Sequence, residues 1–323
     1  MKTFVFPGQG SIKKGMGEKL FNKYPEILKM ADDVLHYSVK NLCLRDPDNL
    51  LQATEYTQSA TYVLSVLSFL ERKDKPDFVA GLSLGEYAAL YAAGVYDFKT
   101  GLALVRKRGQ LMDRKSSGAM AAVIGLEPEK IKNALSTDRF SILDYSLFNT
   151  PSMTILAGPA SDIAKLEPWC KKEQLFYFPL HQLKGAFHSR YMQTVKEEFQ
   201  EFISDMLFSP PEIPIISNVT ARPYTTDSIK KNILDQFTEP VQWTASVNYL
   251  LDKGKMKFYE LGPGNVTSLL ISDIRAYKKM PLFIYKLRLR LLKTKLSRQL
   301  NKRYNIHDQK TSGLKGYNSR HFF

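Results

Sequence analysis

The sequence predicts an α/β fold in which a small subdomain is inserted into a larger body. Three observations support this prediction. An apolar stretch at 78–80 runs into the pattern G-x-S-x-G and then into a helix-like stretch, which is the strand, turn and helix order of α/β-hydrolase-like sheets. Strand and helix patterns alternate along most of the chain, as in α/β proteins. From residue 117 to residue 187 their order is β-α-β-β-α-β, which is the ferredoxin-like arrangement.

The elements of the larger body are expected on both sides of the insertion. A short apolar strand at 4–6 ends at the loop Pro7-Gly8-Gln9-Gly10. This loop lacks the G-K-[ST] of a phosphate-binding P-loop, so no nucleotide site is expected there. Periodicity and apolar runs predict the remaining body elements, which are helices at 17–40, 58–72, 86–93, 98–112, 191–206 and 266–274 and strands at 78–80, 213–217 and 258–261.

The insertion begins where the pattern changes after residue 116. Its expected elements are strands at 119–126, 141–147, 153–156 and 175–180 and helices at 127–135 and 160–173. We therefore expect an α/β-hydrolase-like body at 1–116 and 188–277 and a ferredoxin-like subdomain at 117–187. The last segment, 278–323, is polar and basic after its first part, so we expect it to be disordered or peripheral.

Composition and charge narrow the function classes. Of the 323 residues, 44% are hydrophobic, which is ample for a buried core. The segment 278–323 contains thirteen Lys or Arg and one acidic residue, so it carries +12 of the net charge of +14. Because the body is then nearly neutral, we do not expect nucleic-acid binding by the protein as a whole.

The cysteines and the apolar runs indicate a cytoplasmic protein. Cys43 and Cys170 are too far apart for a C-x-x-C motif and too few for a disulfide framework. The apolar run near the N-terminus is too short for a signal peptide. No stretch approaches the roughly 18 apolar residues of a membrane span, so no span is expected.

Ser83 is the candidate nucleophile. It is the central residue of Gly81-Leu82-Ser83-Leu84-Gly85. In a tight strand-to-helix turn of this kind the serine hydroxyl is exposed, and flanking glycines avoid a clash with neighbouring backbone. The helix N-terminus behind the serine favours developing negative charge. The alternative is a chance pattern in a loop, but the strand before it and the helix after it argue for the nucleophile.

A series of short motifs runs in order through the body and the insertion. These motifs are Phe6-Pro7-Gly8-Gln9-Gly10-Ser11, Gly15-Met16-Gly17, 81–87, Lys107-Arg108-Gly109-Gln110-Leu111-Met112, 120–126, Asn149-Thr150-Pro151, Gly185-Ala186-Phe187-His188-Ser189, Ser217-Asn218-Val219 and Glu260-Leu261-Gly262-Pro263-Gly264. Together they resemble the malonyl-CoA:acyl-carrier-protein transacylase family, and most of all the free-standing acyltransferases that serve modular polyketide synthases in trans. The resemblance is expected to end near residue 277 and not to cover 278–323.

The resemblance implies an acyltransferase that works through a serine ester. Malonyl would pass from malonyl-CoA to Ser83 and then to the phosphopantetheine thiol of an acyl carrier protein, which splits one exchange into two displacements. The serine needs a base, and His188 lies where the family places it. His181 is the main competitor among the five histidines, and a structural role for His188 at a subdomain junction is the alternative. No cofactor and no metal are expected.

Supporting groups for the pair are also implied. The resemblance implies that a backbone carbonyl, at Gln236, orients the histidine in place of an Asp. The residue after an elbow nucleophile, here Leu84, normally donates its backbone N–H to the oxyanion. The resemblance implies that Gln9 donates a second backbone N–H, and Gly8 and Gly10 would let its loop approach the serine closely. The alternative for this loop is an ordinary strand-to-helix turn.

Arg108 is the candidate for substrate recognition. It lies in the R-G-x-x-M position that carries the family's arginine, and a guanidinium can hold a malonyl carboxylate through two parallel hydrogen bonds. A surface salt bridge is the ordinary alternative for a helical arginine. Phe187 matches the malonyl-preferring form of its motif. Gln58 and Asn149 match polar positions that line the family pocket.

Two residues depart from the family pattern inside the matched motifs. Leu82 stands where many relatives have a histidine, but the mechanism does not need that side chain. Met153 stands where a glutamine is common, and a thioether cannot replace the hydrogen bonds of an amide. Acyl selection is therefore less well defined by the sequence than the nucleophile is.

Two other classes of function stay open. An acyl hydrolase of the same fold, acting in trans, would remove acyl groups from carrier proteins; Arg108 argues against it and Met153 keeps it open. A binding protein with a silent serine is disfavoured because Ser83, His188 and Gln9 form a full set. The expected partner is an acidic carrier protein, which a basic surface would attract, and a monomer is expected. The tail is either a solvated appendage or a segment that lies on an anionic surface.

Overall fold

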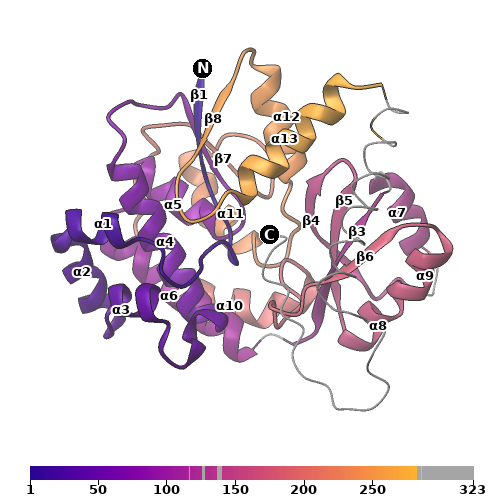
Figure 1. The fold of residues 1–323 in the computed structure, drawn as a ribbon, viewed down its shortest axis with the longest axis horizontal. Coiled ribbons are helices and arrows are strands. Elements are labelled where there is room, and N and C mark those ends of the chain that lie inside the picture. The colour runs from indigo at the N-terminus through magenta and orange to yellow at the C-terminus, as the bar shows by residue number, and fades with distance from the viewer. Residues whose placement is uncertain (116, 126–127, 137–139, 282–284, 286–323) are drawn as a thin grey trace.

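Two four-stranded sheets organise the molecule (Figure 1). The structure is a computed structural model. It describes residues 1–115, 117–125, 128–136, 140–281 and 285. In Figure 1 the antiparallel sheet and its helices lie on one side of the molecule, and the helices α1 to α6 lie on the other.

The body is built on a parallel sheet. Its strand order is β7 (Ile215–Ile216), β2 (Phe78–Gly81), β1 (Lys2–Phe6) and β8 (Lys257–Glu260). In β1, Phe4 and Phe6 belong to one hydrophobic core while Val5 belongs to another that includes Trp243 and Ile271. The continuous apolar run of this strand thus reflects burial on both faces of the sheet.

Helices cover both faces of this sheet. The body helices are α1 (Glu18–Lys23), α2 (Pro25–Leu35), α3 (Val39–Arg45), α4 (Thr54–Leu70), α5 (Gly85–Ala92), α6 (Phe98–Lys115), α10 (Gln193–Phe202), α11 (Ile229–Asp235), α12 (Trp243–Asp252) and α13 (Val266–Lys279), with short 3₁₀ helices at Pro47–Gln52, Arg190–Met192 and Thr226–Ser228. The helices α4 and α5 contribute to the core around Phe4, and α12 and α13 contribute to the core around Val5. None of the described helices is both long and apolar enough to cross a membrane.

The inserted subdomain has its own antiparallel sheet. Its strand order is β4 (Asp144–Thr150), β5 (Met153–Gly158), β3 (Ala119–Ile124) and β6 (Phe176–Pro179). The helices that accompany it are α7 (Pro128–Leu135), α8 (Ala160–Ala164) and α9 (Leu166–Lys172). This is the β-α-β-β-α-β order with the first and third strands at the centre, so the predicted ferredoxin-like subdomain and the predicted fold class are confirmed.

Some predicted elements have different boundaries. The helix expected at 17–40 is three helices, because Pro25 starts α2, His36 ends it in a left-handed conformation and Ser38 caps α3. The helix expected at 160–173 breaks at Lys165, because the ring of Pro168 conflicts with the carbonyl four residues earlier. The strand expected at 141–147 begins only at Asp144, and α11 and α12 were not predicted.

The body extends beyond the boundary expected at residue 277. The helix α13 ends at Lys279, and Lys278 forms an ion pair with Asp252. The buried Tyr285 side chain shares a hydrogen bond of 2.8 Å with Ser152 of the inserted subdomain and donates one of 2.7 Å to Asp273 of α13. The rest of the basic segment, and with it the expected disorder, lies outside the described residues.

Candidate active site

The elbow around Ser83 is a tight turn between β2 and α5. Ser83 has a φ of 51°, in the left-handed region that non-glycine residues avoid. A Cβ on Gly81 would lie 2.0 Å from the carbonyl carbon of Gly85, and a Cβ on Gly85 would lie 2.2 Å from the carbonyl oxygen of Phe6. Only glycine fits both positions. The Ser83 backbone N–H donates to the Asn218 side-chain oxygen at 2.7 Å, which holds the turn.

A histidine from the other end of the insertion meets this serine. His188 Nε2 lies 2.7 Å from Ser83 Oγ, and His188 Nδ1 lies 2.6 Å from the backbone carbonyl oxygen of Gln236. A carbonyl only accepts, so Nδ1 carries the proton and Nε2 presents its lone pair to the serine. The preceding Phe187 is buried, and its carbonyl accepts a hydrogen bond of 2.8 Å from Ser146 of β4.

The imidazole is neutral at physiological pH. Burial and the nearby Arg108 guanidinium lower the pKa of His188 from 6.5 to about 3, against a smaller upward effect of the Gln236 carbonyl. A neutral imidazole can accept the serine proton, as a general base must. The competing His181 is exposed. The two thiols, Cys43 and Cys170, are buried, and burial raises the pKa of each to about 12.

A buried cation lies directly beside Ser83. Arg108 of α6 is 1% exposed, and its Nη2 donates to Ser83 Oγ and to the Gln236 side-chain oxygen, each at 3.2 Å. The rings of Tyr87 and Phe237 lie 5.5 Å and 5.6 Å from its guanidinium carbon. Within the described part of the chain no carboxylate lies within 4 Å of this guanidinium, and its Nε has no acceptor. The site therefore has donor capacity for an incoming anion.

Two backbone donors are free at the elbow. In the part of the chain that the structure describes, the N–H groups of Gln9 and Leu84 have no acceptor. The loop of Gln9 lies against the elbow, because Leu82 N–H donates to Phe6 at 3.0 Å and a Cβ on Gly8 would lie 2.9 Å from the Leu82 oxygen. Leu84 directly precedes α5, where the helix dipole adds positive potential. These donors are suited to an oxyanion.

The two predicted pocket amides, Gln58 and Asn149, have different neighbours. Gln58 Nε2 donates to Gln9 Oε1 at 3.1 Å and to Met112 sulfur at 3.4 Å. Asn149 Nδ2 lies 3.8 Å from the sulfur of Met153. Both amides are buried, and their oxygens have no partner among the described residues. No hydrogen bond joins either amide to Ser83, so their part in substrate binding stays a prediction.

Sequence reasoning missed two residues of this site. Neither was assigned a role: Asn218 lies in the motif 217–219, and Glu86 lies in the motif 81–87 at the start of a predicted helix. Both are 1% exposed and are hydrogen-bonded to each other beside Ser83. The signal for Glu86 was its place in the first helical turn after the elbow glycine. Nothing in the local sequence of Asn218 indicated its distant partner.

Known proteins with similar sequences identify the family of this chain. The family model of the acyl transferase domain matches residues 3–305. The chain belongs to this family. The polyketide biosynthesis malonyl CoA-acyl carrier protein transacylase PksC of Bacillus subtilis is 48% identical over 281 residues, which cover 85% of this chain and 97% of PksC. BaeC of Bacillus velezensis, which has the same description, is 46% identical over the same shares of both chains.

Solved structures agree with these relatives. A malonyl CoA-acyl carrier protein transacylase from Burkholderia pseudomallei has a TM-score of 0.82 and 39% identity, and the match covers 87% of this chain and 99% of that one. A complex of a type II PKS acyl-carrier protein with its malonyl-transacylase gives 0.79 and 31%, covering 84% and 92%. The predicted resemblance is confirmed. Its expected end near residue 277 is wrong, because the family match continues to residue 305.

Proposed function

We propose that the protein transfers a malonyl group from malonyl-CoA to the phosphopantetheine thiol of an acyl carrier protein. The observation that carries this proposal is the buried Arg108 guanidinium 3.2 Å from Ser83 Oγ, next to a neutral histidine at 2.7 Å. A nucleophile, a base and a fixed cation at one point suit an acyl group that ends in a carboxylate. The names of PksC and BaeC support this substrate and a polyketide pathway.

The reaction runs as two displacements on one serine. Ser83 Oγ attacks the thioester carbonyl carbon while His188 Nε2 takes the hydroxyl proton. The backbone N–H groups of Gln9 and Leu84 hold the oxyanion, and the carbon–sulfur bond breaks as coenzyme A leaves with the proton from His188. The carrier thiol then attacks the Ser83 ester and gives its proton to His188, and the serine leaves with that proton.

Arg108 would read the malonyl carboxylate. In the free protein its Nη2 is shared between the serine hydroxyl and Gln236, and its Nε is unpaired among the described residues. A carboxylate can take two parallel hydrogen bonds from such a group in a dry site. An acetyl group offers nothing to this cation, so the site discriminates by charge. Phe187, Gln58 and Asn149 are proposed to shape the rest of the pocket.

The acyl hydrolase is the weaker proposal. Its substrates are acyl groups on carrier proteins, which need no cation beside the ester. Arg108 is present and oriented toward Ser83, and the relatives carry transacylase names. The thioether of Met153 lies against Asn149 and adds no feature that favours water over a carrier thiol.

The cellular setting is proposed from composition and partners. We propose a cytoplasmic location, because both cysteines are buried free thiols. The proposed partners are malonyl-CoA and an acidic carrier protein, and the solved complex of an acyl-carrier protein with its malonyl-transacylase supports a carrier as partner. The proposed state is a monomer.

Intact-protein mass spectrometry tests the function. The purified protein is mixed with malonyl-CoA, and a carrier protein with its phosphopantetheine arm is then added. We expect a malonyl adduct on Ser83 that moves to the carrier thiol, and no adduct on a Ser83→Ala protein of unchanged fold. Loss of acyl groups from a loaded carrier without malonyl transfer would establish the hydrolase. Malonyl labelling of Ser83→Ala would contradict the nucleophile.

A further inference from the structure

Glu86 is a buried carboxylate beside the nucleophile that the two displacements do not use. It lies in the first turn of α5 and is 1% exposed. Its Oε1 accepts a hydrogen bond of 2.6 Å from the Asn218 backbone N–H, and its Oε2 accepts a short one from the Gln236 side chain. A buried charge is costly unless its partners are well placed. A buried carboxylate at this position therefore needs an explanation.

The first partner of Glu86 holds the elbow. Asn218 accepts the backbone N–H of Ser83 at 2.7 Å and donates its side-chain N–H to the Gly81 carbonyl at 2.6 Å. These two bonds span the turn on both sides of the nucleophile. They support the left-handed φ of 51° at Ser83, which is unfavourable without such support.

The second partner of Glu86, Gln236, contacts Ser83, His188 and Arg108. The Gln236 side chain donates to the Ser83 carbonyl at 3.0 Å and accepts from Arg108 at 3.2 Å, while its backbone carbonyl accepts from His188 at 2.6 Å. One residue thus contacts the nucleophile and the cation through its side chain and the base through its backbone carbonyl. Its side-chain nitrogen faces two acceptors, the Ser83 carbonyl and the ionised Glu86, so its side-chain oxygen is left to face Arg108.

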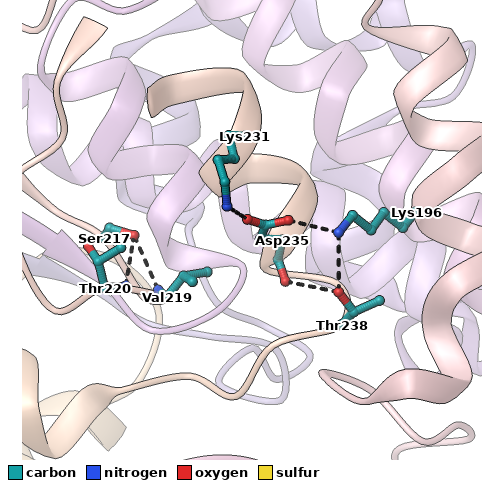
Figure 2. A network of polar contacts seen from close by, with 7 residues as sticks. All are labelled: Lys196, Ser217, Val219, Thr220, Lys231, Asp235 and Thr238. Carbon is teal, nitrogen blue, oxygen red and sulfur yellow. Dashed lines mark hydrogen bonds and ion pairs between the residues drawn. The ribbon is translucent and has the colours of Figure 1, made fainter. Parts of the chain in front are cut away.

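The segments that carry both partners also have contacts that do not involve Glu86. Ser217 precedes Asn218 in the chain. Figure 2 shows that the Ser217 hydroxyl accepts the backbone N–H groups of Val219 and Thr220. It also shows Asp235, next to Gln236, paired with Lys196 at 2.7 Å and with Lys231. Glu86 adds to these outer contacts the hydrogen bond from the Asn218 backbone N–H and the one from the Gln236 side chain.

The charges around Glu86 make it sensitive to neutral pH. Burial raises its pKa to about 7, and the hydrogen bonds from Asn218 and Gln236 and the charge of Arg108 offset this only in part. Four ionisable groups face Glu86. They are Arg108 of α6, Tyr87 of α5, Tyr96 after α5 and Tyr224 after β7. Arg108 is the only cation in this set, so the ionised Glu86 balances it.

We propose that Glu86 is a positioning residue of the acyl transfer site. Through Asn218 and Gln236 its carboxylate holds Ser83, His188 and Arg108 in their reactive arrangement, and its negative charge keeps the buried guanidinium of Arg108 stable before malonyl arrives. This inference rests on the proposed function, since it assigns a support to the groups that carry that function.

The test compares Glu86→Gln with Glu260→Gln. Glutamine keeps the size of Glu86 but presents an NH₂ to one of two donors, so one hydrogen bond and the charge are lost. Glu260 is a matched control, because its carboxylate accepts two backbone N–H groups at the start of α13 and, among the described residues, none from Ser83, Asn218 or Gln236. With saturating malonyl-CoA we expect Glu86→Gln to slow Ser83 acylation by about 10- to 100-fold and to reduce the malonyl-to-acetyl preference. Glu260→Gln should change neither.

A pH series separates positioning from simple loss of stability. The wild-type acylation rate should fall below about pH 7, where Glu86 takes a proton, since His188 has a pKa of only about 3. Glu86→Gln should lack this decline between about pH 6 and about pH 8.5. If Glu86→Gln does not fold, the wild-type profile alone still decides, because a flat profile overturns the proposal.

The outcomes distinguish this inference from the proposed function. No malonyl adduct on the wild-type protein at any pH would reject the function itself. A labelled wild type together with a folded Glu86→Gln that acylates at the same rate and with the same preference would reject only the role of Glu86. A decline below pH 7 that persists in Glu86→Gln would also reject it.

Discussion

At the scale of single residues, the site depends on one buried cation. The Arg108 guanidinium is buried against two aromatic rings, and it lowers the pKa of His188 in addition to the effect of burial. The same charge that would bind malonyl therefore also keeps the base free of its proton. In the proposed function, substrate recognition and base chemistry would be coupled at this point.

Replacing Arg108 should remove charge recognition. We expect Arg108→Gln to lower the preference for malonyl-CoA over acetyl-CoA by about 10- to 100-fold, because a charged hydrogen bond contributes about 1.5–3 kcal/mol. Acylation rates with the two substrates measure this ratio. Lys107→Gln, on the same helix, is the control and should leave it unchanged. An unaltered ratio in Arg108→Gln would show that the carboxylate is bound elsewhere.

His188 should make the stability of the fold depend on pH. Its pKa is about 6.5 when unfolded and about 3 when folded, so its contribution is present above pH 6.5 and is lost as the pH falls toward 3. Relative to His188→Gln, the wild type should lose about 1.4 kcal/mol of unfolding free energy per pH unit in that window. Urea unfolding at several pH values measures this difference. Because Glu86 is present in both proteins, its titration cancels in the difference. Parallel curves of unfolding free energy against pH would contradict the lowered pKa of His188.

At the scale of elements, the elbow needs β1, β2 and α5 to approach more closely than side chains allow. The approach is made by glycines at 81 and 85, whose missing Cβ atoms leave room for backbone. β1 and β2 are parallel neighbours, with Phe6 opposite Gly81. The strand that ends in the Gln9 loop is therefore the strand that flanks the elbow at Ser83.

A methyl group at Gly85 should be severely destabilising. It would lie 2.2 Å from the Phe6 carbonyl oxygen, which belongs to a buried strand and cannot move aside. We expect Gly85→Ala to lose about 3 kcal/mol or more of unfolding free energy and to lose acylation. The reverse exchange on the same helix, Ala92→Gly, should cost only about 1 kcal/mol. Urea unfolding compares them, and equal losses would mean that the elbow can relax.

At the scale of the whole molecule, the site lies where the inserted subdomain meets the body. His188 follows the insertion, and its neighbour Phe187 is held by Ser146 of the antiparallel sheet. Tyr285 makes a second connection, because it contacts Ser152 of the insertion and Asp273 of α13. The position of the base relative to Ser83 depends on such contacts.

Shortened chains should show the contribution of Tyr285. A chain that ends after residue 277 loses the end of α13 and the Tyr285 contacts, while a chain that ends after residue 285 keeps both. We expect the shorter chain to be less stable by about 2 kcal/mol or more, from the lost aromatic burial and hydrogen bonds. Thermal unfolding measures the difference, and Tyr285→Phe isolates the hydroxyl. Equal melting temperatures would contradict a bridging role.

The sequence by itself determined the groups whose chemistry is local. The elbow at Ser83, the alternation of elements and the ferredoxin-like order follow from patterns of a few residues, because periodicity and glycine placement act over short distances. The motif around His188 and Arg108 also lay in the sequence, and it led to the right family. Helix ends at His36 and Lys165 were missed because single capping residues and one proline decide them.

Only the tertiary structure decided how these groups act on one another. Ser83, Arg108, His188 and Gln236 are far apart along the chain, and their hydrogen bonds depend on how the insertion closes onto the body. The lowered pKa of His188 depends on burial, which no local pattern reports. Glu86 and Asn218 are separated by 132 positions, so a sequence that places each one correctly still does not reveal that they meet.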